Sequence, residues 1–288
     1  MTDPFADLLE LPGVGEAVAG ARTAIDGLLG HRVLRRRSAE VTAESALRGA
    51  RASAELEGAG MELERLRGQL MHGQQVTVQS KDQRLGQLAT NAVRVHADLG
   101  SVLTSWKGSP KQALARLHVL AAADLGLPSD ALGRPRTSPT DPCEDPLELG
   151  PAPQPVEVSA RLDGLSRLLL APTAAPAVVV AAVVHGELLA LRPFGSADGL
   201  VARAAARLVL VDRGLDPKAV SAPEVGHVEL DLAGLRVAHV HAYAEAARGY
   251  QAGGRDGVAR WVVHCAEAVA LGAREGLAVC EAILRGAS

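Results

Sequence analysis

One loop of the sequence combines residues that could bind an anion with a residue that would oppose one. Residues 191–203 read LRPFGSADGLVAR and connect two segments with helical patterns. A loop that leads into a helix N-terminus offers free backbone N–H groups and the helix dipole to an anion. Arg192 and Arg203 add guanidinium groups, whereas Asp198 adds a carboxylate that could cap the second helix. The sequence therefore predicts either an anion site or a helix start occupied by Asp198.

Arg192 limits the chemistry that this loop can perform. A guanidinium stays protonated in proteins and cannot act as a general base. At the end of the preceding helix, a positive charge is favoured by the helix dipole alone. Phosphate binding and a structural role are therefore both open for Arg192.

The segments around the loop have the composition and spacing of helices. Hydrophobic residues make up 48% of the 288 residues and aromatic residues only 2%, so Ala, Val and Leu must fill the core. Ala and Leu favour helices, and we predict an all-α fold. Apolar spacing and terminal Gly and Pro signals predict the following helices: 43–56, 61–70, 82–103, 110–125, 156–170, 176–190, 199–213 and a long C-terminal helix.

A proline-rich segment interrupts this pattern. Seven of the 16 prolines lie within residues 135–155, where they exclude a helix. We predict a linker or a long functional loop.

Charge and cysteine content exclude several classes of protein. The net charge is −3 with acids and bases spread along the chain, which argues against nucleic-acid binding. Arg accounts for 26 of the 30 basic residues, which is typical of a GC-rich bacterial genome. The three cysteines indicate neither a disulfide framework nor a zinc site. With no secretory signal and no apolar run of the ~20 residues that a membrane span needs, we expect a cytoplasmic protein.

The loop resembles the signature of the Fic (Fic/Doc, or Fido) domain family, H-P-F-x-[D/E]-G-N-G-R-x-x-R, which joins two helices. Pro193, Phe194, Gly199 and Arg203 match this signature. The catalytic His of the family is replaced by Arg192. The remaining replacements are Ser196 for the metal-binding acid, Ala197 for the first Gly, Asp198 for Asn and Leu200 for the first Arg.

Features outside the loop carry the same resemblance, which covers residues 41–282. His185 lies seven residues before Arg192, where many family members carry a His. Residues 243–269 resemble the family's Tyr-rich helix, Gly-containing turn and Trp-containing apolar helix. An upstream SAELEG stretch fits the family's inhibitory motif through Ser53, Glu57 and Gly58. The resemblance implies that Glu57 reaches Arg203, as a structural ion pair or as a regulatory switch.

The resemblance also implies how the chain is organised. We expect one folding unit with three parts: residues 1–75 hold N-terminal helices that include the inhibitory-type helix, residues 76–253 form the Fic-like core, and residues 254–288 form a C-terminal helix packed on that core. Family members carry a β-hairpin flap where the proline-rich loop lies. A short remnant of this flap is one alternative for the loop.

Active family members transfer AMP from ATP to hydroxyl groups of target proteins. The resemblance implies ATP and Mg²⁺ as cofactor candidates and Phe194, Gly195, Ser196, Asp198, Gly199 and Arg203 as candidate nucleotide- or anion-binding residues. The replacements at Arg192, Ser196 and Leu200 remove the base, a metal ligand and a phosphate contact. We therefore expect a regulatory or binding pseudoenzyme with a protein partner. The alternatives are a transferase of AMP or another phosphate-containing group with altered residues, and a purely structural helical interaction module.

Other candidate sites are weaker. His239 and His241 do not share a helix face, and with Glu245 they do not make a convincing metal site. Gly272 and Gly276 form a G-x-x-x-G pattern that predicts close helix packing, with a homodimer seam as an alternative. Cys265 and Cys280 are expected to be small buried hydrophobes, and Cys143 lies in the proline-rich loop.

Overall fold

The computed structural model describes residues 3–72, 81–228 and 240–286, and the regular structure of these residues is entirely helical. In chain order the elements are η1 (Ala6–Glu10), α1 (Val14–Leu29), η2 (Arg32–Arg35), α2 (Ser38–Leu56), α3 (Leu63–His72), α4 (Lys81–Gly108), α5 (Pro110–Ala121), α6 (Pro155–Leu170), α7 (Ala177–Leu191), α8 (Asp198–Asp212), α9 (Pro223–Gly226), α10 (Val240–Ala252) and α11 (Gly254–Leu284), where η marks a 3-10 helix. The predicted all-α fold is confirmed.

The helix boundaries differ from the sequence predictions by a few residues in most cases. The helix predicted from residue 43 begins at Ser38. The prediction missed this start because no strong capping signal marks it in the sequence. Residues 135–154 form turns and irregular backbone without a strand, so this segment is a long loop and the hairpin alternative is not formed. The division of the chain at residues 75 and 253 stays a prediction.

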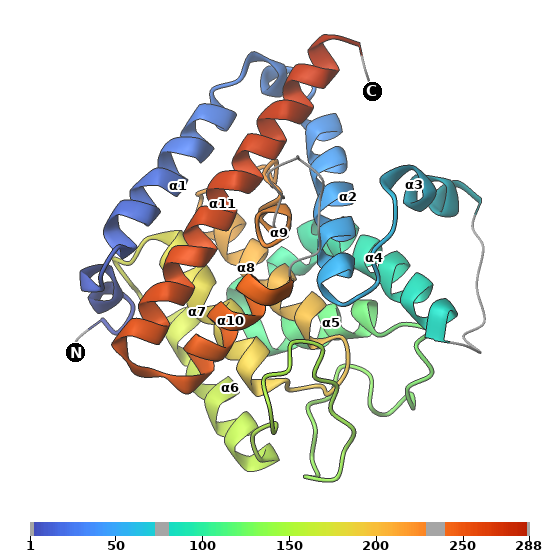
Figure 1. Cartoon of the computed structure of the whole chain (residues 1–288), viewed down its shortest axis with the longest axis vertical. Helices are drawn as coiled ribbons and strands as arrows, with labels where there is room; N and C mark the ends of the chain where they lie inside the picture. Colours follow the sequence, from blue (N-terminus) through green and yellow to red (C-terminus); the bar gives the residue numbers. More distant parts are fainter. Residues whose placement is uncertain (1–2, 73–80, 229–239, 287–288) are drawn as a thin grey trace.

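Helices α7 and α8 form the centre of the molecule. The α7 sequence AVVVAAVVHGELLAL is apolar around almost its whole circumference, and most of its side chains are buried, as expected for a helix with neighbours on all sides. Helices α4 and α5 contact α8, whereas α10 and α11 contact α7 (Figure 1). This packing fixes the C-terminal end of α7 and the N-terminal end of α8, between which the motif loop lies.

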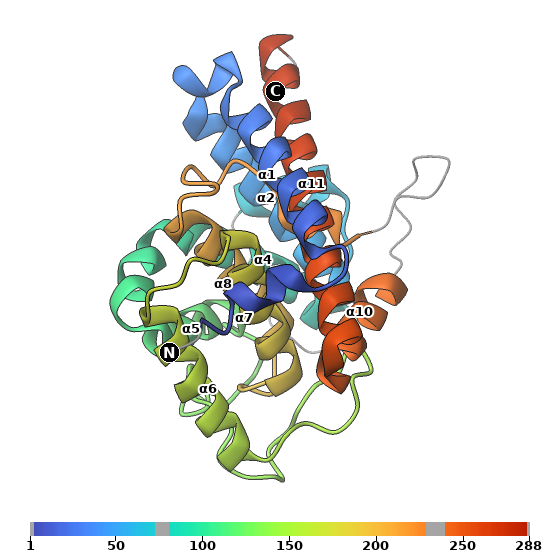
Figure 2. The same ribbon diagram turned by 90° about the vertical axis from the view of Figure 1, so that its left-hand side faces the viewer.

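Helix α11 packs the C-terminal part of the chain against the N-terminal helices. It packs along α1 and also contacts α2, and the three helices lie alongside one another in the upper half of the molecule (Figure 2). Gly272 and Gly276 of α11 lie against residues 220–223 of this chain. A Cβ at Gly272 would lie 2.5 Å from the backbone of Ala222 and Pro223, and a Cβ at Gly276 would lie 2.5 Å from the Val220 carbonyl oxygen. The G-x-x-x-G pattern therefore serves packing within the chain.

A buried ion pair links α8 to α9. The Arg207 Nη1 lies 3.2 Å from the Glu224 Oε2, and both side chains are 2% exposed. Arg207 Nη2 also donates to the carbonyl oxygens of Ala219 (3.0 Å) and Ser221 (2.6 Å). Gly49 of α2 lies against this pair, where a side chain would collide with both charged groups.

None of the described helices combines the length and hydropathy that a membrane span requires. The three cysteines are free thiols, and Cys265 and Cys280 are buried as expected.

The packing of α11 gives a stability prediction. Gly272→Ala should destabilise the fold by about 1–3 kcal/mol, because the added methyl group meets backbone that cannot move aside easily. Gly27→Ala on the exposed face of α1 is the matched control, because a Cβ there meets nothing within 4 Å. This control should stabilise the protein by about 0.5–1 kcal/mol. Urea denaturation measures both changes, and equal stability of the two variants would contradict the packing of α11.

Candidate functional site

The loop between α7 and α8 has an unusual backbone. Arg192, Gly195 and Ala197 have φ angles of 43°, 76° and 54°, all in the left-handed region. Only the glycine adopts this region without steric cost. The loop therefore needs contacts from the surrounding structure that hold Arg192 and Ala197 in place.

The Arg192 side chain supplies one set of these contacts. Its Nη1 lies 3.2 Å from Asp145 Oδ2, and its Nη2 donates to the Gly150 carbonyl oxygen at 2.6 Å. The Asp145 carboxylate also accepts hydrogen bonds from the backbone N–H groups of Leu149 and Gly150, both at 2.8 Å. Arg192 is only 4% exposed. Its charge is therefore neutralised by the proline-rich segment, which it fastens to the end of α7.

Arg136 fastens the other end of the proline-rich segment to the same helix end. Its Nε donates to the Arg192 carbonyl oxygen at 3.0 Å, and its backbone N–H donates to Pro193 at 2.7 Å. Its Nη2 lies 3.4 Å from the Leu191 carbonyl oxygen and 3.1 Å from that of Pro153. The last carbonyl groups of a helix have no partner within the helix. Arg136 satisfies them with a cation, which the helix dipole favours.

The middle of the proline-rich segment lies directly on the motif loop. The Glu144 N–H donates to the Gly195 carbonyl oxygen at 2.8 Å, and a Cβ at Gly195 would collide with the Pro142 carbonyl oxygen. Ser196 Oγ donates to Glu144 Oε1 at 3.2 Å, and Glu144 in turn pairs with Arg84 of α4. Ser196 is thus part of a contact between the loop and the proline-rich segment.

The Asp198 side chain folds back onto the motif loop. Its Oδ1 accepts a hydrogen bond from the Phe194 N–H at 3.0 Å, so the carboxylate takes up a backbone donor that an external anion would otherwise use. It does not cap α8, whose N-cap residue is Ala197. Burial raises the pKa of Asp198 to about 7, although the N–H groups of Phe194 and Gly195 oppose this shift.

Arg203, in the second turn of α8, pairs with Glu57, the C-cap residue of α2. Arg203 Nη2 donates to Glu57 Oε1 at 2.7 Å and to the Ser53 carbonyl oxygen at 3.0 Å, and its Nε donates to Ser53 Oγ at 2.7 Å. The side chains of Arg203 and Glu57 are 1% and 5% exposed. The Glu57 carboxylate lies so close to Gly199 that a Cβ at this position would force the Glu57 side chain to shift. A second carboxylate of the chain therefore occupies the N-terminal end of α8.

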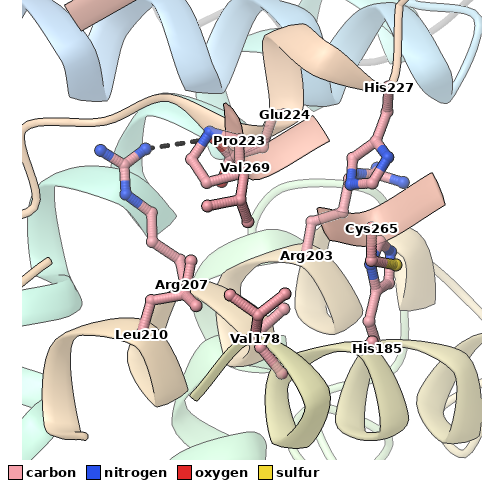
Figure 3. A pocket seen from close by; sticks show the side chains of 13 residues that line it. Val178, His185, Arg203, Arg207, Leu210, Pro223, Glu224, His227, Cys265 and Val269 are labelled. Atoms are coloured by element: carbon pink, nitrogen blue, oxygen red, sulfur yellow. Dashed lines mark hydrogen bonds and ion pairs between the residues drawn. The ribbon is translucent and has the colours of Figure 1, made fainter. Parts of the chain in front are cut away.

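Behind Arg203 lies a group of neutral aromatic side chains. Arg203 Nη1 donates to the Tyr243 hydroxyl at 3.2 Å, which lies 2.7 Å from His185 Nε2. His227 stands next to His185, with ring centroids 5.1 Å apart, and Figure 3 shows both beside Arg203 and Cys265. Burial lowers the pKa of His185 and that of His227 well below the ordinary value. The imidazoles are therefore uncharged around the buried guanidinium.

The predicted site residues fall into two groups around α8. Arg192, Ser196 and Asp198 lie against the proline-rich segment, whereas Arg203 contacts Ser53 and Glu57. Phe194 is buried and stacks on His118, with ring centroids 4.3 Å apart, and Gly58 follows the C-cap of α2 with a φ of 77°. His239 and the side chain of His241 lie outside the described residues.

Sequence reasoning did not find the groups that close the site. Arg136, Asp145 and Gly150 belong to a segment without helical periodicity, and their contacts with α7 span more than 40 residues. Tyr243 was part of a Tyr-rich helix, but its contact with Arg203 had no signal in the sequence. Arg84 lies on a predicted amphipathic helix, where an exposed position is the ordinary expectation for arginine.

Little space remains at the motif loop. The cavity bounded by Glu57, Asp145, Arg192, Asp198 and their neighbours has a volume of about 20 Å³, which holds about one water molecule. Within the described parts of the chain, no group of three or more His, Cys, Asp or Glu side chains is arranged to hold a metal ion. The contacts described above hold the motif loop and the proline-rich segment in place.

Comparisons with known proteins agree with this architecture at the level of fold. No protein-family model matches the sequence, and no curated protein matches it. A Fic family protein from Desulfovibrio desulfuricans G20 has a similar structure, with a TM-score of 0.69 and 18% identity over 93% of this chain and 75% of that chain. A segment of Fic-1 from C. elegans has a TM-score of 0.68 and 16% identity over 93% and 73% of the two chains.

A third similar structure is a Fic domain containing signaling protein from Bacteroides thetaiotaomicron VPI-5482. Its TM-score is 0.60 and its identity is 14%, over 94% of this chain and 99% of that chain. Three structures with sequence identities of 14–18% cover nearly the whole chain with the same arrangement of helices. The chain therefore has the Fic fold.

Proposed function

We propose that this chain is a Fic-fold pseudoenzyme that does not transfer AMP and acts by binding a protein partner. The observation that carries the proposal is the state of Arg192, which stands where the family signature places its catalytic His. A general base must accept a proton from the target hydroxyl group. A guanidinium cannot do so, and this one is buried, paired with Asp145 and bonded to Gly150.

The residues present do not fit ATP with a divalent cation. Glu57 places a carboxylate at the start of α8 and Asp198 takes up the Phe194 N–H, where the phosphates of a nucleotide would need positive charge and free N–H groups. Ser196 stands at the position of the metal-binding acid and contacts Glu144. The cavity of about 20 Å³ is far smaller than the ~300–1,000 Å³ typical of ligand pockets.

A binding role is supported by the buried ion pairs and hydrogen bonds that hold the helices and the proline-rich segment together. The buried ion pair of Arg203 and Glu57 joins α2 to α8, and Arg192 and Arg136 join the proline-rich segment to α7. These contacts hold the proline-rich segment, α2, α7 and α8 in one defined surface. A rigid surface reduces the conformational entropy that is lost when a partner binds.

The first prediction concerns catalysis. The purified chain, incubated with ATP labelled at the α-phosphate and with Mg²⁺ or Mn²⁺, should show no incorporation of label above a sample without protein. Arg192→His should not restore transfer, because Ser196, Asp198 and Leu200 still lack the required groups. Gel autoradiography measures incorporation, with an active Fic AMP transferase as positive control. Incorporation that disappears in Arg203→Ala would overturn the proposal.

The second prediction concerns the pair of Glu57 and Arg203. Glu57→Gln should destabilise the fold by about 3–5 kcal/mol, because it leaves a buried guanidinium without its counter-charge. Glu40→Gln is the matched control on α2, because Glu40 forms an exposed pair with Arg37 that is worth about 0–1 kcal/mol. Urea denaturation measures the free energy of unfolding of both variants.

The same variants separate the structural pair from a regulatory switch. A structural pair predicts that Glu57→Gln loses stability and gains no thermal shift with ATP and Mg²⁺. A live switch would show the opposite: nucleotide binding that appears only after Glu57 is replaced.

A further inference from the structure

A groove on the opposite side of α7 is much larger than the cavity at the motif loop. It has a volume of about 430 Å³ and lies between α6, α7 and the turn from α10 to α11. In Figure 2, α7 lies between α6 and α10 in the lower half of the molecule. Pro153, Ala190 and Val258 give the groove apolar walls, and its polar groups are Glu157, Arg161, Glu187, Tyr250 and Gln251.

The donors of the groove already serve its own carboxylates. Arg161 forms a bidentate contact with Glu187 at 3.0–3.2 Å, and its Nη1 donates to Glu157 Oε1 at 3.0 Å. The Tyr250 hydroxyl donates to Glu187 Oε1 at 3.0 Å. Glu187 accepts four of these bonds, three from Arg161 and one from Tyr250, which use its acceptor capacity almost completely.

The groove has more hydrogen-bond acceptors than Arg161 and Tyr250 can satisfy. One oxygen of the half-exposed Glu157 accepts the hydrogen bond from Arg161, and the buried Oε1 of Gln251 has no hydrogen-bond partner among the described residues. Glu157 and Glu187 carry two negative charges against the single positive charge of Arg161. A ligand that complements this groove must therefore bring a positive charge and N–H donors.

We propose that this groove binds an arginine or lysine side chain of a protein partner. The aliphatic stem of such a side chain matches the walls formed by Pro153, Ala190 and Val258, and its cationic head matches the half-exposed carboxylate of Glu157. Val156, the neighbour of Glu157 in the sequence, is 79% exposed and offers an apolar contact to the rest of a partner. The proposal rests on the proposed function as a binding protein and names the chemistry of its partner.

Arg161 already makes, within the chain, the kind of contact that we propose for the partner's side chain. Its guanidinium already lies between Glu157 and Glu187, and the fork geometry of the group suits carboxylates. Removing Arg161 should leave both carboxylates open to an external guanidinium. The groove should then bind a cationic side chain more tightly than the unchanged protein does.

The test is an NMR titration of the full chain with Nα-acetyl-arginine amide. The amide signals of Gly253 and Ala190, which line the groove, should shift in a saturable way. Nα-acetyl-citrulline amide, a neutral molecule of nearly the same shape, should produce no saturable shift. Higher salt concentration should weaken the binding, because a partly exposed charge pair is screened. Equal shifts with both amides, or none with either, would overturn the proposal.

Three variants make the test specific. Glu157→Gln should weaken binding of the arginine amide by about two- to fivefold, and Arg161→Gln should strengthen it by a similar factor, the range expected for partly exposed charge pairs. Arg167→Gln, on the exposed face of the same helix, is the matched control and should leave the affinity unchanged. Affinities that do not respond to the change at Glu157 would contradict the assignment, even if Arg161→Gln does not fold. AMP transfer by the chain would refute the proposed function and leave this binding test unaffected.

Discussion

The guanidinium of Arg192 sets the arrangement of the whole motif region. It lies at the C-terminal end of the most buried helix, where the dipole favours a positive charge, and it reaches Asp145 and the Gly150 carbonyl oxygen. A buried charge is tolerated only when it is paired and hydrogen-bonded. Asp145 and Gly150 of the proline-rich segment engage both Nη atoms, and only the buried Nε has no partner among the described residues, so the burial of Arg192 depends on the closed loop.

Arg203, the second buried guanidinium of the site, is also paired and hydrogen-bonded within the chain. Arg203 is buried between α8 and α2, and Glu57, Ser53 and Tyr243 satisfy it. Glu57 and Asp198 then place carboxylates at the start of α8, where a loop of this shape would otherwise receive an anion. The loop thus leads into the N-terminus of α8 while its polar groups are used within the chain.

Much of this structure could be predicted from the sequence, and the remainder has a clear physical reason. The high content of Ala and Leu, the scarcity of aromatic residues and the proline cluster indicated an all-α fold with one long loop. The pairing of Glu57 with Arg203 was implied by the family resemblance. The contacts of Arg136 and Asp145 were missed, because nothing local in an irregular, proline-rich segment indicates which distant helix end it meets. The Gly272 contact was predicted as close packing, but its partner depends on the position of α9.

Hydrogen exchange across the proline-rich segment tests the central claim most directly. The amides of Glu144, Leu149 and Gly150 donate to Gly195 and Asp145, so they should exchange slowly in the unchanged protein. Arg192→His should speed their exchange by about tenfold or more, because it removes the cation that holds Asp145 and Gly150. Exchange at the rate of an unstructured peptide in the unchanged protein, or protection that is the same in both proteins, would contradict the closure of this site by Arg192.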